Sequence, residues 1–312
     1  MFDVSKRITI IIVIILLSIY IASSAPELAT NEAQWGDSKN VQETVENWGI
    51  DDLQRFDVHV RYFLLSLSVN LFDNMKIIPF LASISLLILT FFVTKKLTNK
   101  RFPGIISMVV LLQSNIFLSY DTTAIYTNFW IVFYLLSLYL VYKKWQFSAL
   151  SFLVSIPTKI LTLAFFPMSL FFIFRSNISR KQKIYTLISY GILIGILLVT
   201  ISILNVDLGT NQINFLEKNF LPAFSSVASQ LRLDGFVIVF LLPLIVGLFL
   251  VSKRGLLAAD SISVLISGVI MVSPILVTFT SMTNQPYRLI PLIVFFAIGV
   301  GMLFSKIKTK NE

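Results

Sequence analysis

Two parts of the sequence gather residue types that can carry chemistry. The first is residues 31–59, a polar stretch between apolar runs that holds the chain's one histidine and nearly half of its sixteen acids. Carboxylates and imidazoles are the groups that most often accept protons in catalysis or bind metal ions. The second is a pair of cations, Lys159 and Arg288, each flanked by apolar sequence. A charge in such surroundings is costly unless it has a partner or a function, so both are candidate binding residues.

Several of these residues also have interpretations that need no chemistry. The acids of a charge-rich loop are usually solvated. Asp57 and His59 could lie together as metal ligands, but a lone histidine has no second one to join it. Trp35 suits either stacking on a sugar ring or an aromatic belt at the membrane interface, and the same holds for Trp48. Asp121 suits a helix N-cap better than catalysis.

The composition indicates a membrane protein. Of 312 residues, 56% are hydrophobic and 13% are charged, and the mean hydropathy is +0.84. A soluble domain carries about 25% charged residues. The net charge of +9 does not indicate nucleic-acid binding, because the basic residues form short clusters between hydrophobic runs. The absence of cysteine excludes disulfides, thiolate metal sites and a cysteine nucleophile.

Long apolar runs predict an all-α, polytopic membrane protein. They cover roughly 8–24, 77–94, 103–120, 125–142, 183–204, 236–252, 258–281 and 289–305. The stretch 146–174 is too long for one upright helix and is interrupted by "IPTKI" at 156–160. It is therefore predicted to be a hairpin of two short helices.

The basic clusters predict the topology. They are Lys6/Arg7, Lys95/Lys96/Lys100/Arg101, Lys143/Lys144, Arg175/Arg180/Lys181/Lys183, Lys253/Arg254 and Lys306/Lys308/Lys310. If all are cytoplasmic, the hairpin is required and the chain has about ten membrane segments with both termini inside. Residues 1–312 then form a single membrane domain of the cell membrane, and 25–75 and 205–235 are its first and second extracytoplasmic loops.

Four segments, in chain order, resemble the GT-C superfamily of membrane glycosyltransferases, which includes protein O-mannosyltransferases and RgtA-like transferases. "NEAQW" (31–35) is similar to that family's DE-x-x-Y segment after its first helix, and "HVRYFLLSLSVNLF" (59–72) to its interfacial helix. "LSFLVSIPTKILTLAFFPMSLFFIF" (150–174) resembles the helix pair with a lysine at its outer turn. "NQPYRLIPLIVFF" (284–296) resembles its late "HPRYLLPLLPFL" segment.

The resemblance implies an inverting glycosyltransferase. Such an enzyme moves a sugar from a polyprenyl- or dolichyl-phosphate donor to an acceptor on the extracytoplasmic face. A carboxylate of the first loop acts as general base, a role that falls here on Glu32. Asn31 stands where the family has its leading aspartate, and Asp37 is the acid that could compensate.

The same resemblance assigns the donor site. Lys159, Arg288 and Tyr287 are expected to bind the phosphate, which becomes more anionic as it leaves. Lys159 could instead snorkel to the interface, and Arg288 could anchor the chain there. The candidates for acceptor or sugar contacts are Trp35, Asp57, His59 and Asp121. No metal site or firm cofactor is assigned, although a divalent cation is compatible with the reaction.

The expected partners are the polyprenyl-phosphate sugar donor, membrane lipids and possible membrane-protein partners. Two other functions stay open, because Asn31 replaces an acid and no soluble C-terminal domain is visible. One is a non-catalytic subunit of a membrane protein complex that docks through the first loop. The other is a small-molecule or lipid transporter, since the interrupted stretch 146–174 is similar to the broken helices that line transporter sites.

Overall fold

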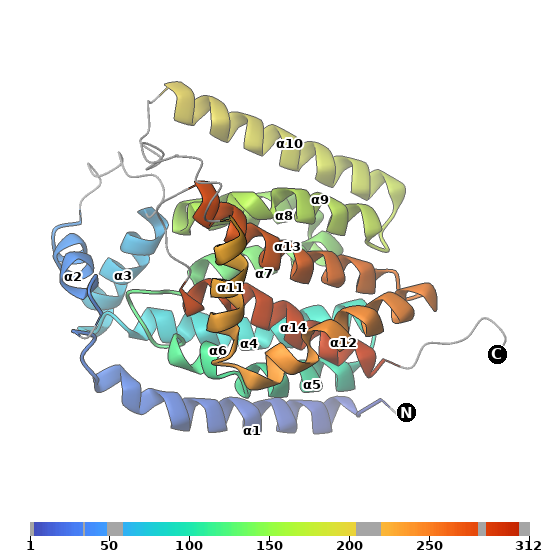
Figure 1. Cartoon of the computed structure of the whole chain (residues 1–312), viewed down its shortest axis with the longest axis horizontal. Coiled ribbons are helices and arrows are strands. Elements are labelled where there is room, and N and C mark those ends of the chain that lie inside the picture. Colours follow the sequence, from blue (N-terminus) through green and yellow to red (C-terminus); the bar gives the residue numbers. More distant parts are fainter. Residues whose placement is uncertain (1–2, 34, 49–58, 204–219, 280–284, 306–312) are drawn as a thin grey trace.

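The computed structural model describes residues 3–33, 35–48, 59–203, 220–279 and 285–305, and every regular element among them is a helix (Figure 1). The first elements are α1 (Lys6–Ser24), the 3-10 helix η1 (Ala25–Ala29), α2 (Ser38–Glu46), α3 (His59–Phe72), α4 (Ile77–Thr98), α5 (Arg101–Leu112), α6 (Asn115–Ser119) and α7 (Phe129–Lys143). Then come α8 (Trp145–Ser155), η3 (Ile156–Thr158), η4 (Ile160–Phe165), α9 (Phe166–Arg175), α10 (Arg180–Ile203), α11 (Phe220–Leu231), α12 (Gly235–Lys253), α13 (Ala258–Phe279), η7 (Pro286–Leu289) and α14 (Ile290–Leu303). The all-α prediction is confirmed for these residues.

Five of the described helices are long and apolar enough to cross a membrane. They span Lys6–Ala29, Ile77–Thr98, Arg180–Thr200, Gly235–Lys253 and Pro286–Leu303. Shorter apolar helices cover Arg101–Leu112, Phe129–Lys143, Ile160–Arg175 and Ala258–Val272. An upright crossing needs about 20 residues, so the count of ten crossings stays a prediction, as does the side that each end faces.

Local sequence explains where helices near the bundle ends start and stop. The Ser5 hydroxyl accepts a hydrogen bond from the Ile8 N–H and so caps α1. α4 ends at Asn99, whose left-handed φ of 56° stops the helix. Lys95 and Lys96 lie in its last turn, where cations interact favourably with the helix dipole.

α14 forms the centre of the bundle. Its residues 290–298 are buried, and the helix packs against α4, α5, α12 and α13 (Figure 1). Gly301 permits a close approach to α5, because a Cβ there would lie 2.4 Å from the Pro103 carbonyl oxygen. The centre of the bundle is therefore tightly packed.

α1 and α10 lie at opposite edges of the bundle (Figure 1) and expose apolar side chains. The exposed isoleucines are Ile8, Ile10, Ile11, Ile14, Ile15, Ile19 and Ile21 on α1 and Ile184, Ile188, Ile192 and Ile196 on α10. Contiguous apolar surface of this kind suits contact with lipid. Both helices thus have the character of the outer, lipid-facing layer of a membrane protein.

The two described ends of the chain lie at the same end of the bundle. Asp3, just before α1, forms an ion pair with Arg101 at 3.5 Å. The neighbouring Phe102 ring packs against Phe304, just after α14, with ring centroids 6.3 Å apart. α2 and α3 lie at the opposite end (Figure 1). The first loop is thus separated from both described chain ends by the length of the bundle.

Candidate functional site

Lys159 lies in the turn that interrupts the predicted hairpin. Its backbone is extended (φ −166°, ψ 115°) between η3 and η4, so no regular helix passes through this position. The ammonium nitrogen lies 3.9 Å from the centroid of the Tyr287 ring and 5.4 Å from that of Trp130. The break turns this lysine onto aromatic faces, where cation–π attraction replaces part of its hydration.

Two arginines lie close to this lysine. The Arg288 guanidinium carbon is 5.8 Å from the Tyr287 ring centroid, and its Nε donates a 3.4 Å hydrogen bond to the Tyr287 hydroxyl. Burial, and then the positive charges of Arg288 and Arg61, hold the pKa of Lys159 well below its ordinary value. We call Arg61, Lys159 and Arg288 the cation cluster.

The cation cluster has no acidic partner at ion-pair distance among the described residues. The ion pairs there join other residues. Arg61 donates instead to the carbonyl oxygens of Ala124 and Ile125, and its Nε has no partner in the described part of the chain. Three cations that repel one another can be brought together at lower cost when an anion binds between them.

Aromatic rings surround the cation cluster on the side of the first loop. Tyr126 stacks on Tyr287 with centroids 4.2 Å apart and an interplanar angle of 16°. The Trp35 ring meets Tyr126 edge-on at 5.3 Å, and Tyr120 contacts all three rings. Tyr120 is buried and the other three rings are partly exposed. Such a wall reduces the contact of the cations with water, which strengthens their interaction with a bound anion.

Asp37 extends this site towards the first loop. It occupies the N-cap position of α2, yet its side chain makes no capping hydrogen bond. Burial lowers the pKa of the Arg61 guanidinium, and the nearby negative charge of Asp37 is one of the effects that oppose this lowering. Burial, and then the charge of Asp37, raises the pKa of Tyr126 to about 12. Asp37 is therefore a carboxylate beside the cations whose side chain is not used to cap its own helix.

Glu32 contacts the segment before α7 that carries Tyr126. It is 8% exposed, and its Oε1 accepts a 3.0 Å hydrogen bond from the Ala124 N–H and lies 3.7 Å from the Lys76 ammonium. Its Oε2 is buried without a hydrogen-bond partner among the described residues. Burial raises the pKa of Glu32, whereas the Ala124 hydrogen bond and the Lys76 charge oppose that rise. This carboxylate faces a backbone segment and a lysine.

The other predicted residues lie apart from the cation cluster. Asp121 is 1% exposed, and its Oδ2 accepts a 2.6 Å hydrogen bond from the Ser24 hydroxyl. Asn128, and not Asp121, occupies the N-cap position of the helix that follows, although its side chain makes no capping hydrogen bond there. The N-cap interpretation of Asp121 is therefore wrong. His59 begins α3 and lines a separate pocket. Asp57 lies outside the described residues.

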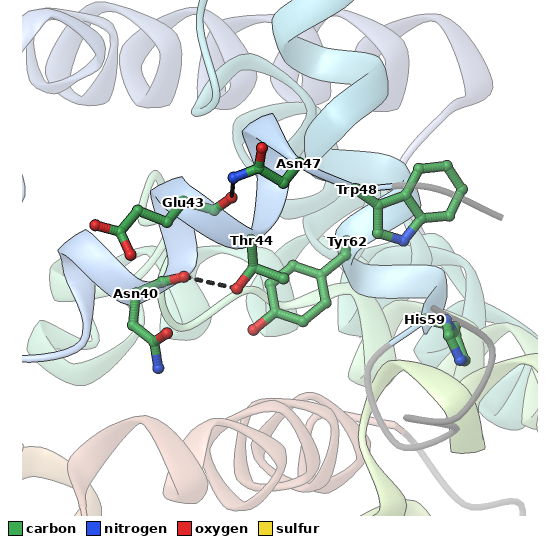
Figure 2. A pocket seen from close by; sticks show the side chains of 7 residues that line it. All are labelled: Asn40, Glu43, Thr44, Asn47, Trp48, His59 and Tyr62. Carbon is green, nitrogen blue, oxygen red and sulfur yellow. Dashed lines mark hydrogen bonds between the residues drawn. The ribbon is translucent and has the colours of Figure 1, made fainter. Parts of the chain in front are cut away.

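This pocket, of about 350 Å³, lies between α2 and α3 (Figure 2). Its lining residues are Asn40, Glu43, Thr44, Asn47, Trp48, His59 and Tyr62. The Tyr62 ring centroid lies 5.4 Å from the guanidinium carbon of Arg61. The pocket is therefore a neighbour of the cation cluster, with Tyr62 between them.

Sequence reasoning missed Arg61, Lys76, Tyr126 and Trp130. Arg61 carried the same signal as Lys159, since it is the single cation of the apolar stretch 60–72. The two aromatic residues carried none, because an apolar chain rich in aromatics offers many equivalent candidates. Lys76 is identified by its contact with Glu32, which only the fold shows.

No protein-family model, curated protein or solved structure matches this chain. The chemistry of the site therefore has to be inferred from its own geometry. That geometry combines a cation cluster that could bind an anion, a wall of aromatic rings, and the Asp37 carboxylate, which does not cap its own helix. All three lie at one end of a bundle of apolar helices. Within the described residues, no group of three or more histidine, aspartate and glutamate side chains is placed to hold a metal ion.

Proposed function

We propose that this protein is an integral-membrane, inverting glycosyltransferase that takes a sugar from a polyprenyl- or dolichyl-phosphate donor. The observation that carries the proposal is the cation cluster, which has no ion-pair partner among the described residues. A phosphate is the anion that such a cluster suits, because several of its oxygens can accept hydrogen bonds at once. Asp37 supplies a carboxylate beside it.

The position of the cluster favours a lipid-linked phosphate. Lys159 lies between η3 and η4, and Arg288 lies in η7, directly before the apolar α14. A phosphate held there would leave its hydrocarbon tail free to lie along apolar helices in the bilayer. The cost of keeping these cations near the membrane is offset only if they perform such a task.

In the proposed reaction, the acceptor hydroxyl loses its proton to a first-loop carboxylate as its oxygen attacks the anomeric carbon. The bond from that carbon to the phosphate oxygen breaks, and its electron pair stays on the phosphate. Lys159, Arg288 and Arg61 stabilise the charge that grows there. Asp37 suits the role of base better than Glu32, because one Glu32 oxygen already holds the Ala124 N–H.

A transfer assay with a radiolabelled polyprenyl-phosphate sugar tests the proposal. We expect Lys159→Ala to lower kcat by about 10²- to 10³-fold, the usual effect of removing one charge-stabilising group. Lys95→Ala is the matched control, since Lys95 lies in the last turn of α4 and forms no part of the site. Equal transfer by wild type and Lys159→Ala would refute the assignment of the donor site.

The broken helix at Lys159 also suits a transporter. Discontinuous helices in transporters place their binding site near the middle of the membrane. A transporter would move a labelled lipid-phosphate sugar across a vesicle membrane without breaking the sugar–phosphate bond. Analysis of the label in the same assay therefore separates the two functions, and the transferase requires a new glycosidic bond.

A further inference from the structure

We infer that the pocket between α2 and α3 binds a pyranose ring of the acceptor, an inference that rests on the proposed transferase function. The volume of about 350 Å³ lies within the range of ligand pockets, about 300–1,000 Å³. Its walls come from two helices of the first loop, which approach each other around Trp48 and Tyr62 (Figure 2).

The lining of the pocket suits an uncharged ligand rich in hydroxyl groups. Asn40 and Asn47 present carboxamides, which both donate and accept hydrogen bonds as sugar hydroxyls do. Trp48 and Tyr62 offer ring faces for the C–H faces of a pyranose. Among the described residues of the lining, Glu43 is the one carboxylate, and none is a lysine or an arginine. A phosphate would be repelled, so this pocket is distinct in chemistry from the cation cluster.

Two polar atoms of the lining need partners. The Trp48 Nε1 and the His59 Nε2 are buried and have no hydrogen-bond partner among the described residues. Buried polar groups in folded proteins are nearly always hydrogen-bonded, so each one left over requires an explanation. Both atoms are closed to solvent, so a sugar in the pocket would bond to them only after their side chains move.

The pocket and the proposed reaction centre share two helices. α3 presents Tyr62 to the pocket and directs the neighbouring Arg61 to the Ala124 and Ile125 carbonyls. Asp37 lies at the start of α2, three residues before Asn40 and so about one turn away on the same face. A sugar in the pocket would therefore have a carboxylate at one end and the cation cluster behind Tyr62, the arrangement that an acceptor hydroxyl needs.

Saturation-transfer NMR on the full chain in lipid nanodiscs tests the inference, with methyl glucoside, galactoside, mannoside and N-acetylglucosaminide as probes. We expect saturation transfer to at least one probe, with binding weakened at least tenfold by Trp48→Ala and by Asn40→Ala. Trp145→Ala is the matched control, because Trp145 stacks on Tyr185, on helices outside the first loop. No transfer to any probe, or unchanged binding by Trp48→Ala, would overturn the inference.

Two further arms separate this inference from the proposed function. Lys159→Ala should bind the glycoside as wild type does while losing polyprenyl-phosphate binding. If wild type binds polyprenyl phosphate but no glycoside, the pocket assignment fails and the donor site stands. If it binds glycoside but no polyprenyl phosphate, the donor site fails and the pocket stands as a sugar site.

The pyranose could also belong to the donor, and competition tells the two sources apart. Glycoside binding should persist at a saturating concentration of the polyprenyl-phosphate sugar if the pocket holds the acceptor. Displacement of the glycoside by the intact donor, but not by polyprenyl phosphate alone, would overturn the acceptor assignment.

Discussion

Ala124 is held from two sides by side chains of opposite charge. Its N–H donates to Glu32 and its carbonyl oxygen accepts from Arg61. Tyr126, two residues on, stacks on Tyr287 against the cation cluster. This arrangement suits Glu32 to holding the Ala124 segment in position, and it leaves Asp37 as the acid beside the cations.

Neutral, isosteric variants distinguish these two acids. We expect Asp37→Asn to lower kcat for transfer by about 10²- to 10⁴-fold, the usual contribution of a general base, with KM little changed. Glu32→Gln keeps an oxygen for the Ala124 N–H but removes the charge beside Lys76, so it should lower stability by about 1–3 kcal/mol. Its activity per folded molecule should stay within a few fold of wild type.

Transfer kinetics and thermal unfolding of both variants provide the measurement. A folded but inactive Glu32→Gln protein, together with an active Asp37→Asn protein, would reverse the assignment. Arg61→Lys adds a check on positioning. Lysine keeps the charge but replaces the planar guanidinium, whose Nη2 donates to both carbonyl oxygens, by an ammonium group on a more flexible stem.

Asp121 gives the protein a predictable dependence of stability on pH. Burial raises the pKa of its carboxyl to about 6, helped by the nearby charge of Glu27 and opposed by the hydrogen bond from Ser24. The folded state thus binds this proton more tightly than the unfolded chain, where the ordinary value near 3.8 applies. The contribution to stability is complete below pH 4 and is lost as the pH rises to about 6.

Comparison with Asp121→Asn isolates this effect, because other carboxyl groups titrate in both proteins. The shift of about 2 units corresponds to about 3 kcal/mol. The unfolding free energy of wild type minus that of the variant should fall by about this amount between pH 4 and pH 7. Parallel stability curves for the two proteins would show that Asp121 keeps an ordinary pKa.

Among the helices, the break at Lys159 was predictable and the packing around it was not. A lone lysine in the apolar stretch 146–174, two residues after Pro157, indicated a turn, and η3 and η4 meet there. The contact of Lys159 with Tyr287 depends on the meeting of segments more than a hundred residues apart. Helical periodicity describes which residues a helix presents, but it does not specify which distant helix covers them.

The approach of α14 to α5 makes a prediction for glycine substitutions. In Gly301→Ala the new Cβ would lie 2.4 Å from the Pro103 carbonyl oxygen and 2.9 Å from Thr94 Cγ2, and backbone cannot move as easily as a side chain. We expect a loss of stability of about 1–3 kcal/mol, the usual cost of overpacking. Thermal unfolding of the purified protein measures it.

Gly191→Ala on α10 is the matched control, because a Cβ there meets no atom within 4 Å. It should leave stability unchanged or raise it by up to about 1 kcal/mol, since alanine favours the helix. Equal melting temperatures for the two variants would mean that α14 and α5 do not approach as described.

Over the whole molecule, the structure separates basic clusters from the candidate site. Arg175 forms an ion pair with Asp260, and the Lys96 ammonium lies over the Tyr142 ring, so basic loops far apart in sequence meet. The sequence predicts from charge alone that all basic clusters share one side of the membrane. These two contacts each join two loops, so the shared side of all clusters stays a prediction. The sequence could not predict the lengths of the short helices, since apolar runs continue past the ends of the helices into the turns.

The orientation of the bundle in the membrane is the property on which the proposed function depends, and it can be measured directly. Because the chain has no cysteine, Lys39→Cys and Lys181→Cys each introduce a single reactive thiol at an exposed position. We expect a membrane-impermeant maleimide to label Lys39→Cys in intact cells and Lys181→Cys only after permeabilisation. A sugar donor and its acceptor outside the cytoplasm require the first loop to be outside as well. Labelling of Lys181→Cys alone would place the cation cluster on a face that the proposed reaction cannot use. Labelling of both variants in intact cells would instead contradict the predicted cytoplasmic side of the basic clusters.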